Sequence, residues 1–130
     1  MKLKVVNDDE YGVAVIETKD SHFPLCLFLT DIYEQGCIDE VMGELNKCQQ
    51  IEKHINLSFN ASVIEVFTSF VIVSDQEDEY HWKFDLVNIK DLLNNWKKVI
   101  KKQKFPSEIG FLGELLTHKD YELLFQKKEN

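Results

Sequence analysis

Side chains alternate strictly between apolar and polar over residues 80–86. The apolar set is Tyr80, Trp82, Phe84 and Leu86, and the polar set is His81, Lys83 and Asp85. Because successive side chains of a strand point to opposite faces of a sheet, this pattern predicts a strand with one buried face and one wet face. Antiparallel sheets accept that asymmetry, whereas parallel sheets bury both faces. The chain is therefore expected to contain an antiparallel sheet.

Three stretches that precede this strand predict further strands. Each is rich in the β-branched and aromatic residues that fit a half-buried pleated surface. The stretches are Ile55–Phe59, Val63–Phe67 and Phe70–Val73. Their close succession predicts consecutive antiparallel strands, with residues 74–79 forming an acidic turn before the last one.

Two other stretches have the period of an α-helix. Over residues 38–48, apolar side chains recur every three or four positions and acidic side chains fill the opposite side. Over residues 88–102, one apolar stripe contains Leu92, Leu93 and Trp96, and lysines lie outside it. Asn88 is suited to cap this second helix, and Trp96 is expected to pack in the core.

The two ends of the chain are less regular. Lys2–Val6 and Gly12–Glu17 flank a polar turn and predict a β-hairpin with an acidic tip. Leu25–Leu29 is apolar at every position, as expected of a central strand covered on both faces. Pro106 is expected to open a short helix that ends near Leu116, followed by an extended Tyr121–Phe125, although a helix also fits that last segment.

The composition indicates one folded domain over residues 1–130. The 130 residues are 44% hydrophobic and 29% charged, with two prolines and no segment that resembles a linker. The expected fold is α+β, with a mainly antiparallel sheet and two or three helices packed on it. Cys26, Cys37 and Cys48 are too widely spaced for a zinc ribbon and are expected to be reduced. No stretch is apolar for long enough to span a membrane, so a cytoplasmic location is expected.

The charge distribution is strongly uneven. The net charge is −8 and the basic residues are all lysines. Residues 1–80 carry five lysines against sixteen acidic residues, whereas residues 81–130 carry ten lysines against seven. An acidic chain that lacks arginine is poorly suited to hold nucleic-acid phosphates, so direct nucleic-acid binding is not expected. Its acidic part could instead attract a basic partner protein.

Motifs for cofactor or metal chemistry are not found. The four histidines are far apart in sequence and are predicted to be surface or half-buried side chains: His22, His54, His81 and His118. Asp75, Glu77 and Glu79 have the spacing of the first ligands of a calcium loop, but the required Gly and final Glu of that loop are missing. No glycine-rich phosphate loop occurs either. We therefore expect no cofactor, no metal and no catalytic residue.

Two acidic turns remain as candidates for recognition. The first contains Asp8, Asp9 and Glu10, and the second contains Asp75, Glu77, Asp78 and Glu79. Either turn could be an ordinary solvated loop. An acidic hairpin tip could also enter a basic active-site cleft and occupy the positions of substrate phosphates.

A resemblance favours the second interpretation. The segments 62–67 and 70–75, the strand Tyr80–Leu86 and a helix with Leu92-Leu93-x-x-Trp96-Lys97 resemble the immunity proteins of bacterial polymorphic toxin and contact-dependent growth inhibition systems. The resemblance covers about residues 60 to 103. It implies a non-enzymatic protein that binds and neutralises a cognate toxin domain, often a nuclease.

This resemblance leads to a hypothesis about the residues that bind the partner. The primary candidates are Asp75, Glu77, Asp78 and Glu79, with Asp8, Asp9, Glu10, Asp39, Glu40 and Glu44 as alternates. Nuclease domains are commonly basic, so an acidic inhibitor would associate quickly with such a toxin. Two alternatives stay open: another protein-interaction or regulatory module, which could use an exposed sheet edge, and a small enzyme or ligand-binding protein.

Overall fold

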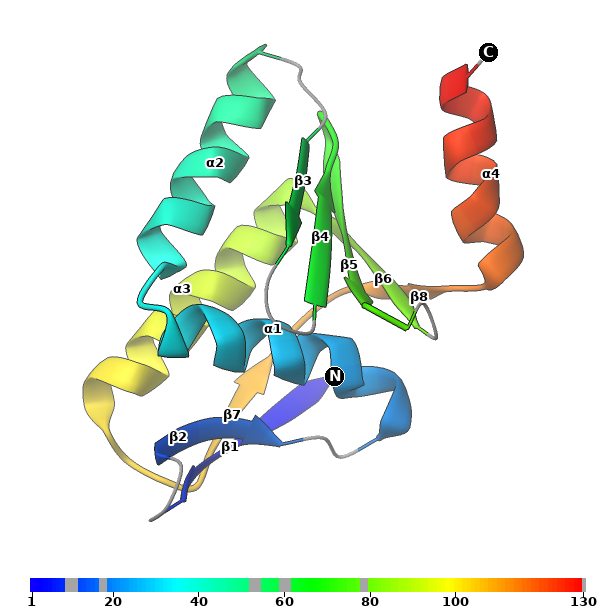
Figure 1. Ribbon diagram of the computed structural model, residues 1–130. Coiled ribbons are helices and arrows are strands. Elements are labelled where there is room, and N and C mark those ends of the chain that lie inside the picture. The colour runs from blue at the N-terminus through cyan, green and yellow to red at the C-terminus, as the bar shows by residue number, and fades with distance from the viewer. Residues whose placement is uncertain (9–11, 17–18, 52–54, 59–61, 78–79, 130) are drawn as a thin grey trace.

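The chain forms two antiparallel sheets with helices between and around them (Figure 1). The computed structural model describes residues 1–8, 12–16, 19–51, 55–58, 62–77 and 80–129. Over this part of the chain, helices and strands mix without a repeating βαβ unit, so the fold is α+β with antiparallel strand pairing, as the sequence predicts. No helix in these ranges is both long enough and apolar enough to cross a membrane.

The smaller sheet pairs the N-terminal hairpin with a strand from late in the chain. It contains β1 (Lys2–Asp8), β2 (Gly12–Ile16) and β7 (Ser107–Gly110) in the order β2-β1-β7. The predicted N-terminal hairpin is confirmed, because β1 and β2 pair antiparallel and Val5 lies opposite Val15. The tip of this hairpin, residues 9–11, lies outside the described residues.

The larger sheet contains the strands predicted from the middle of the chain. These are β3 (Ile55–Ser58), β4 (Ser62–Val66), β5 (Phe70–Asp75) and β6 (His81–Asp85), with β8 (Glu114–Leu116) as a fifth strand. The order is β3-β4-β5-β6-β8, so the first four strands follow one another as expected. Val73 lies opposite Ile64 on one side and Trp82 on the other, which places these apolar side chains on the same face.

The prediction of a central strand at Leu25–Leu29 is wrong. This segment belongs to helix α1 (Phe23–Glu34), which follows a short 3-10 turn, Asp20–His22, and has Pro24 in its first turn. In Figure 1, α1 runs between the two sheets, and its neighbours include β2, β4 and β5. A helix surrounded by protein is apolar on every side, and a short apolar run looks the same in a buried strand.

The two helices expected from their periodicity are confirmed. Helix α2 spans Ile38–Ile51 and helix α3 spans Leu86–Lys102. Asn88 does not cap α3, since the helix begins two residues earlier and Asp85 is its extended N-cap residue. The indole Nε1 of Trp96 in α3 donates a hydrogen bond to the backbone oxygen of Leu29, 2.9 Å away, and so connects α3 to α1.

The C-terminal prediction is also wrong. Residues 107–116 form β7 and β8 instead of a helix, and the final segment is helix α4 (His118–Glu129) rather than a strand. Ile109 lies opposite Leu3 of β1 and is 1% exposed, so pairing with a distant strand overrides the local helical signal. The helix that the sequence allowed for this last segment is the form observed.

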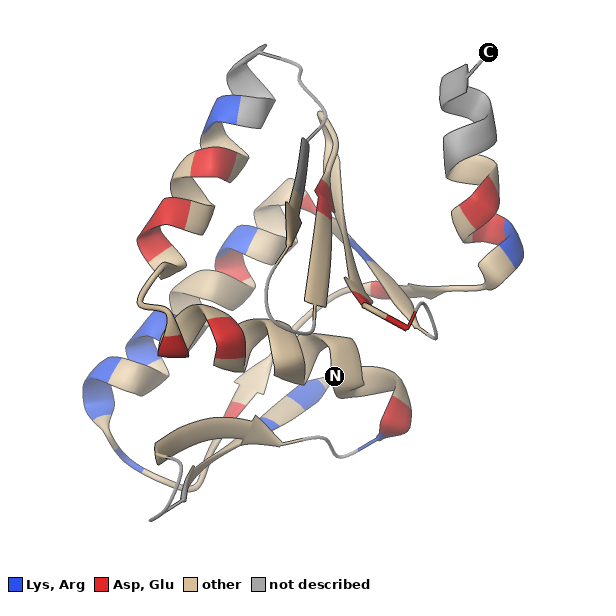
Figure 2. Ribbon diagram, viewed as in Figure 1, with Lys and Arg blue, Asp and Glu red and all other residues tan. Residues whose placement is uncertain are grey.

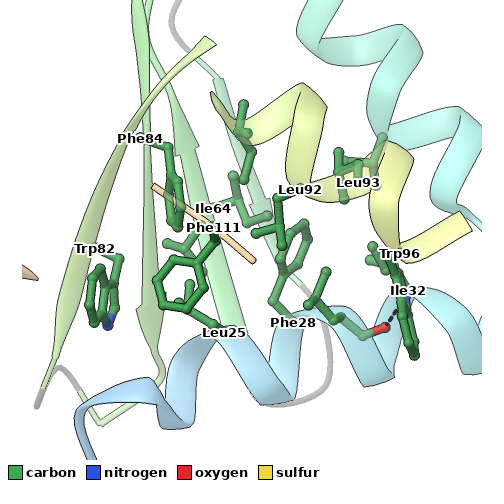
Figure 3. Packing of buried hydrophobic residues seen from close by; sticks show 14 of the residues in the cluster. Leu25, Phe28, Ile32, Ile64, Trp82, Phe84, Leu92, Leu93, Trp96 and Phe111 are labelled. Atoms are coloured by element: carbon green, nitrogen blue, oxygen red, sulfur yellow. Dashed lines mark hydrogen bonds between the residues drawn. The ribbon is translucent and has the colours of Figure 1, made fainter. Parts of the chain in front are cut away.

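One cluster of buried hydrophobic side chains fills the space between the sheets (Figure 3). Phe28 and Ile32 enter it from α1, Leu92 and Trp96 from α3, and Phe84 from β6. The core thus lies on one face of the larger sheet. Helix α4 lies on the other side of that sheet in Figure 1, and α2 lies beside its β3 edge.

Candidate functional site

The acidic turn after β5 differs from its expected form. Asp75 is not an exposed loop residue, because it ends β5, lies opposite Ser62 of β4 and is 2% exposed. Its carboxylate oxygen Oδ1 accepts a hydrogen bond from the backbone N–H of Tyr80 at 3.3 Å. Asp75 therefore shapes the turn and is poorly placed to touch a partner. Glu77 is exposed in the turn, and Asp78 and Glu79 lie outside the described residues.

Most of the N-terminal acidic turn lies outside the described residues. Asp8 is the last residue of β1, but its side chain is outside the described part of the chain. Asp9 and Glu10 also lie outside it. The hypothesis that these three residues bind a partner stays a prediction.

The candidate acidic residues on helix α2 all lie within the described part of the chain. Asp39, Glu40 and Glu44 are named here the α2 acidic face; Asp39 and Glu40 are exposed and Glu44 is half-buried. Figure 2 marks acidic positions along this helix in red. Asp39 is bridged to Lys97 of α3 with a separation of 2.6 Å, and Glu44 lies 3.5 Å from Lys47 on its own helix. Both pairs are largely exposed to solvent, where such pairs contribute little to stability. These carboxylates can therefore exchange their lysine for a cation of a partner at small cost.

A hollow of about 390 Å³ opens beside the α2 acidic face. Its lining residues are Gln35, Cys37, Glu40, Val41, Glu44 and Leu57. Glu40 and Glu44 are one helical turn apart and so stand on the same side of α2, while Val41 and Leu57 are apolar. The side chains of lysine and arginine combine an apolar stem with a cationic head, and this lining matches both parts.

Cys37 lines this hollow, and its pKa is affected by burial and by the nearby negative charge. Burial raises the pKa of Cys37 above its ordinary value, and the carboxylate of Glu40 raises it further. A negative field disfavours the thiolate for the same reason that it favours a bound cation. The thiol is thus held neutral, which makes Cys37 a poor nucleophile. Neither Cys37 nor Leu57 was singled out by sequence for this position, because only tertiary structure brings β3 next to α2.

A basic surface lies next to the acidic one. The exposed lysines of α3 gather at its C-terminal end, as the sequence predicts (Figure 2). The residues concerned are Lys97, Lys98, Lys101 and Lys102. Lysines in the last turn of a helix complement its dipole, so they have a structural reason to be there.

Two histidines that are distant in sequence meet on the larger sheet. The ring of His81 stacks on Tyr121 of α4 with centroids 3.6 Å apart, and His118 approaches it edge-on at 5.5 Å. His81 Nδ1 and Ser74 Oγ are 2.6 Å apart and hydrogen-bonded. The predicted wet face of β6 is therefore covered here, since His81 is 2% exposed. A Ser–His pair this deeply buried is closed to substrate, and its role in this conformation is structural.

His22 is a second buried imidazole. It packs edge-on against Trp82 and Phe111, with ring centroids 5.6 Å and 5.3 Å away. Burial lowers the pKa of His22 below its ordinary value of 6.5, with smaller effects from Lys19 and the N-terminal amino group.

Within the described ranges, no group of three or more His, Cys, Asp or Glu side chains is placed to hold a metal ion. His54 and the side chain of Cys48 fall outside those ranges.

Similarity to known proteins does not identify the chain. No protein-family model, curated protein or solved structure matches it. A function must therefore be inferred from the surface that the fold presents, and its most distinctive feature is the α2 acidic face with the adjoining hollow.

Proposed function

We propose that this protein is a non-enzymatic immunity protein that binds and neutralises a basic cognate toxin domain of the nuclease type in the cytoplasm. The observation that carries this proposal is the hollow beside the α2 acidic face, whose lining combines Glu40 and Glu44 with the apolar Val41 and Leu57. The net charge of −8 and the resemblance of residues 60–103 to immunity proteins support it. The partner would be a protein, with no direct contact to nucleic acid or membrane.

The electrostatics suit an inhibitor that must act before the toxin finds its substrate. A nuclease domain binds phosphates through cationic side chains, so its surface attracts an acidic protein at long range. Such steering raises association rates well above those of neutral pairs, and the effect weakens with salt. After encounter, a lysine or arginine of the toxin would enter the hollow and contact Glu40 and Glu44.

This proposal changes the ranking of the candidate residues. Glu40 and Glu44 become the primary contacts, with Asp39 of the same helix as a further contact. The exposed Glu77, in the turn after β5, stays a separate candidate. Asp75 is removed from the set because its carboxylate is buried at the end of β5. The hypothesis that Asp8, Asp9, Glu10, Asp78 and Glu79 contact the partner stays a prediction.

A pull-down tests the proposal directly. The tagged protein is expressed together with the product of the neighbouring upstream gene, recovered at 0.1 M and about 0.5 M salt, and analysed by mass spectrometry. We expect one partner fragment that is lethal when expressed alone, and weaker recovery at high salt. Recovery of a harmless partner would instead favour a regulatory module, and recovery of nothing would overturn the proposal.

Charge substitutions then test the surface. The variant Glu40→Gln/Glu44→Gln should weaken partner binding by about 10-fold or more and flatten its salt dependence, because a hydrogen bond to a charged group contributes about 1.5–3 kcal/mol. The matched control Asp20→Asn/Glu114→Gln removes the same charge at exposed positions away from α2. Equal affinity of the two variants would show that the hollow is not the binding site.

A further inference from the structure

The larger sheet has a polar patch on the face opposite the core. Glu65 of β4, Ser74 of β5 and His81 of β6 point to that side, and we name them the polar face. Ser74 and His81 are register neighbours, and Glu65 lies opposite Ile72, two residues from Ser74 along β5. All three are at most 5% exposed, so something covers them.

Helix α4 supplies the cover. Besides stacking on His81, Tyr121 donates its hydroxyl to the Glu65 carboxylate at 2.5 Å. Tyr121 therefore reaches across the sheet from β6 to β4. The helix itself is capped locally, since the Thr117 hydroxyl accepts the backbone N–H of Asp120 at 3.1 Å. Its first turn can thus stay helical whether or not it touches the sheet.

The contacts of α4 differ in kind from those of α3. Helix α3 buries Leu92, Leu93 and Trp96 completely in the core. Among the described side chains of α4, five of the seven are exposed, and only Tyr121 and Leu124 are half-buried. Burial of apolar surface is the main source of stability, so over these residues α4 is held less strongly than α3.

The polar residues beneath α4 would also tolerate contact with water. A carboxylate, a hydroxyl and an imidazole regain hydrogen bonds from solvent when they are uncovered, whereas apolar core residues do not. Ile72 of β5 lies on the same face and is 0% exposed. Detaching α4 therefore costs the ring stack and the hydroxyl bond of Tyr121, together with any cover that α4 gives Ile72, but leaves the core between the sheets intact.

We infer that α4 opens and closes over the polar face while both sheets, α1 and α3 stay folded. Closed, α4 seals Glu65, Ser74 and His81 from solvent. Open, it presents a carboxylate and a Ser–His pair on a surface that shares no residue with the α2 acidic face. Any partner that binds the polar face must select the open form, and its apparent affinity is reduced by the fraction of time that α4 is closed.

Chemical labelling of histidines tests this inference on the intact protein. Diethyl pyrocarbonate acylates accessible neutral imidazoles, and mass spectrometry locates the product on each peptide. His81 reports opening of α4, and the core-packed His22 serves as the reference for wider unfolding. We expect His81 to react faster than His22 in the unmodified protein, although both are at most 4% exposed.

Two substitutions at Tyr121 test how strongly its contacts limit the labelling of His81. Tyr121→Phe keeps the ring stack and removes the bond to Glu65, and Tyr121→Ala removes both. The His81 labelling rate should rise about tenfold in Tyr121→Phe and further in Tyr121→Ala, with His22 unchanged. Lys119→Ala, at an exposed position of α4, is the control and should leave both rates unchanged.

Amide hydrogen exchange gives an independent measurement. In Tyr121→Phe, exchange should accelerate in α4 and stay constant in α3. The inference is wrong if His81 and His22 react at one common rate in all variants, or if either Tyr121 variant accelerates exchange in α3 as much as in α4. Neither result depends on whether the acidic face binds a toxin.

Discussion

Replacing Trp96 by phenylalanine should weaken the connection between α3 and α1. The Trp96 side chain is fully buried, donates a hydrogen bond to the Leu29 oxygen and contacts the ring of Tyr33 edge-on at 5.9 Å. Phe cannot make the hydrogen bond, which removes about 1 kcal/mol. The smaller ring leaves a cavity that costs about 1–2 kcal/mol more, since complete truncation of a buried tryptophan costs about 3–5 kcal/mol. We expect a total loss of about 2–3 kcal/mol, or about 7–11 °C in Tm for a chain of this size.

Urea denaturation followed by circular dichroism at 222 nm measures this loss without depending on tryptophan fluorescence. Val87→Ala is the matched control in the same helix, because Val87 is 68% exposed and its truncation should change stability by less than about 0.5 kcal/mol. An unfolding free energy for Trp96→Phe within about 0.5 kcal/mol of the unmodified protein would refute the reasoning. It would mean that the indole does not join the two helices.

Three further perturbations have clear expected outcomes. The lowered pKa of His22 means that the unfolded chain binds more protons between the folded pKa and 6.5, so the free energy of unfolding should fall as pH is lowered through that range. Urea titrations at several pH values should show a smaller fall in His22→Gln. Gly113→Ala should destabilise the protein by about 1–3 kcal/mol in thermal melts, because the added Cβ would lie 2.7 Å from the buried Phe84 ring. The raised pKa of Cys37 predicts slow alkylation by iodoacetamide at pH 8, and Glu40→Gln should accelerate it in peptide mapping.

The two helices that the sequence predicted correctly share one property. In α2 and α3, one side faces the core and the other faces solvent, so the period of apolar residues identifies the element. Strand β6 also alternates, although α4 covers His81 on its polar face. Helix α1 lacks that contrast because protein surrounds it, and its apolar run was mistaken for a strand. The segment from Ser107 to Leu116 was mistaken for a helix because its strands pair with β1 and β6, both far away in sequence.

The candidate site was predicted in part. The acidic side of α2 followed from the positions of Asp39, Glu40 and Glu44 in a helical repeat. In the structure, Asp39 and Glu40 are exposed and Glu44 is half-buried. The hollow could not be predicted, because Leu57 reaches it only when β3 packs beside α2. Asp75 was misplaced for a similar reason, since its burial depends on pairing with Ser62.

The sequence by itself determined the α+β class, the middle strands of the larger sheet, two helices and the separation of acidic from basic residues. These features follow from local spacing and composition, which any short window of the chain contains. The tertiary structure alone decided that α1 lies between two sheets, that β7 and β8 join strands distant in sequence, and that Tyr121 covers His81. Those arrangements depend on which surfaces can be buried together, and burial is a property of the whole chain rather than of any one segment.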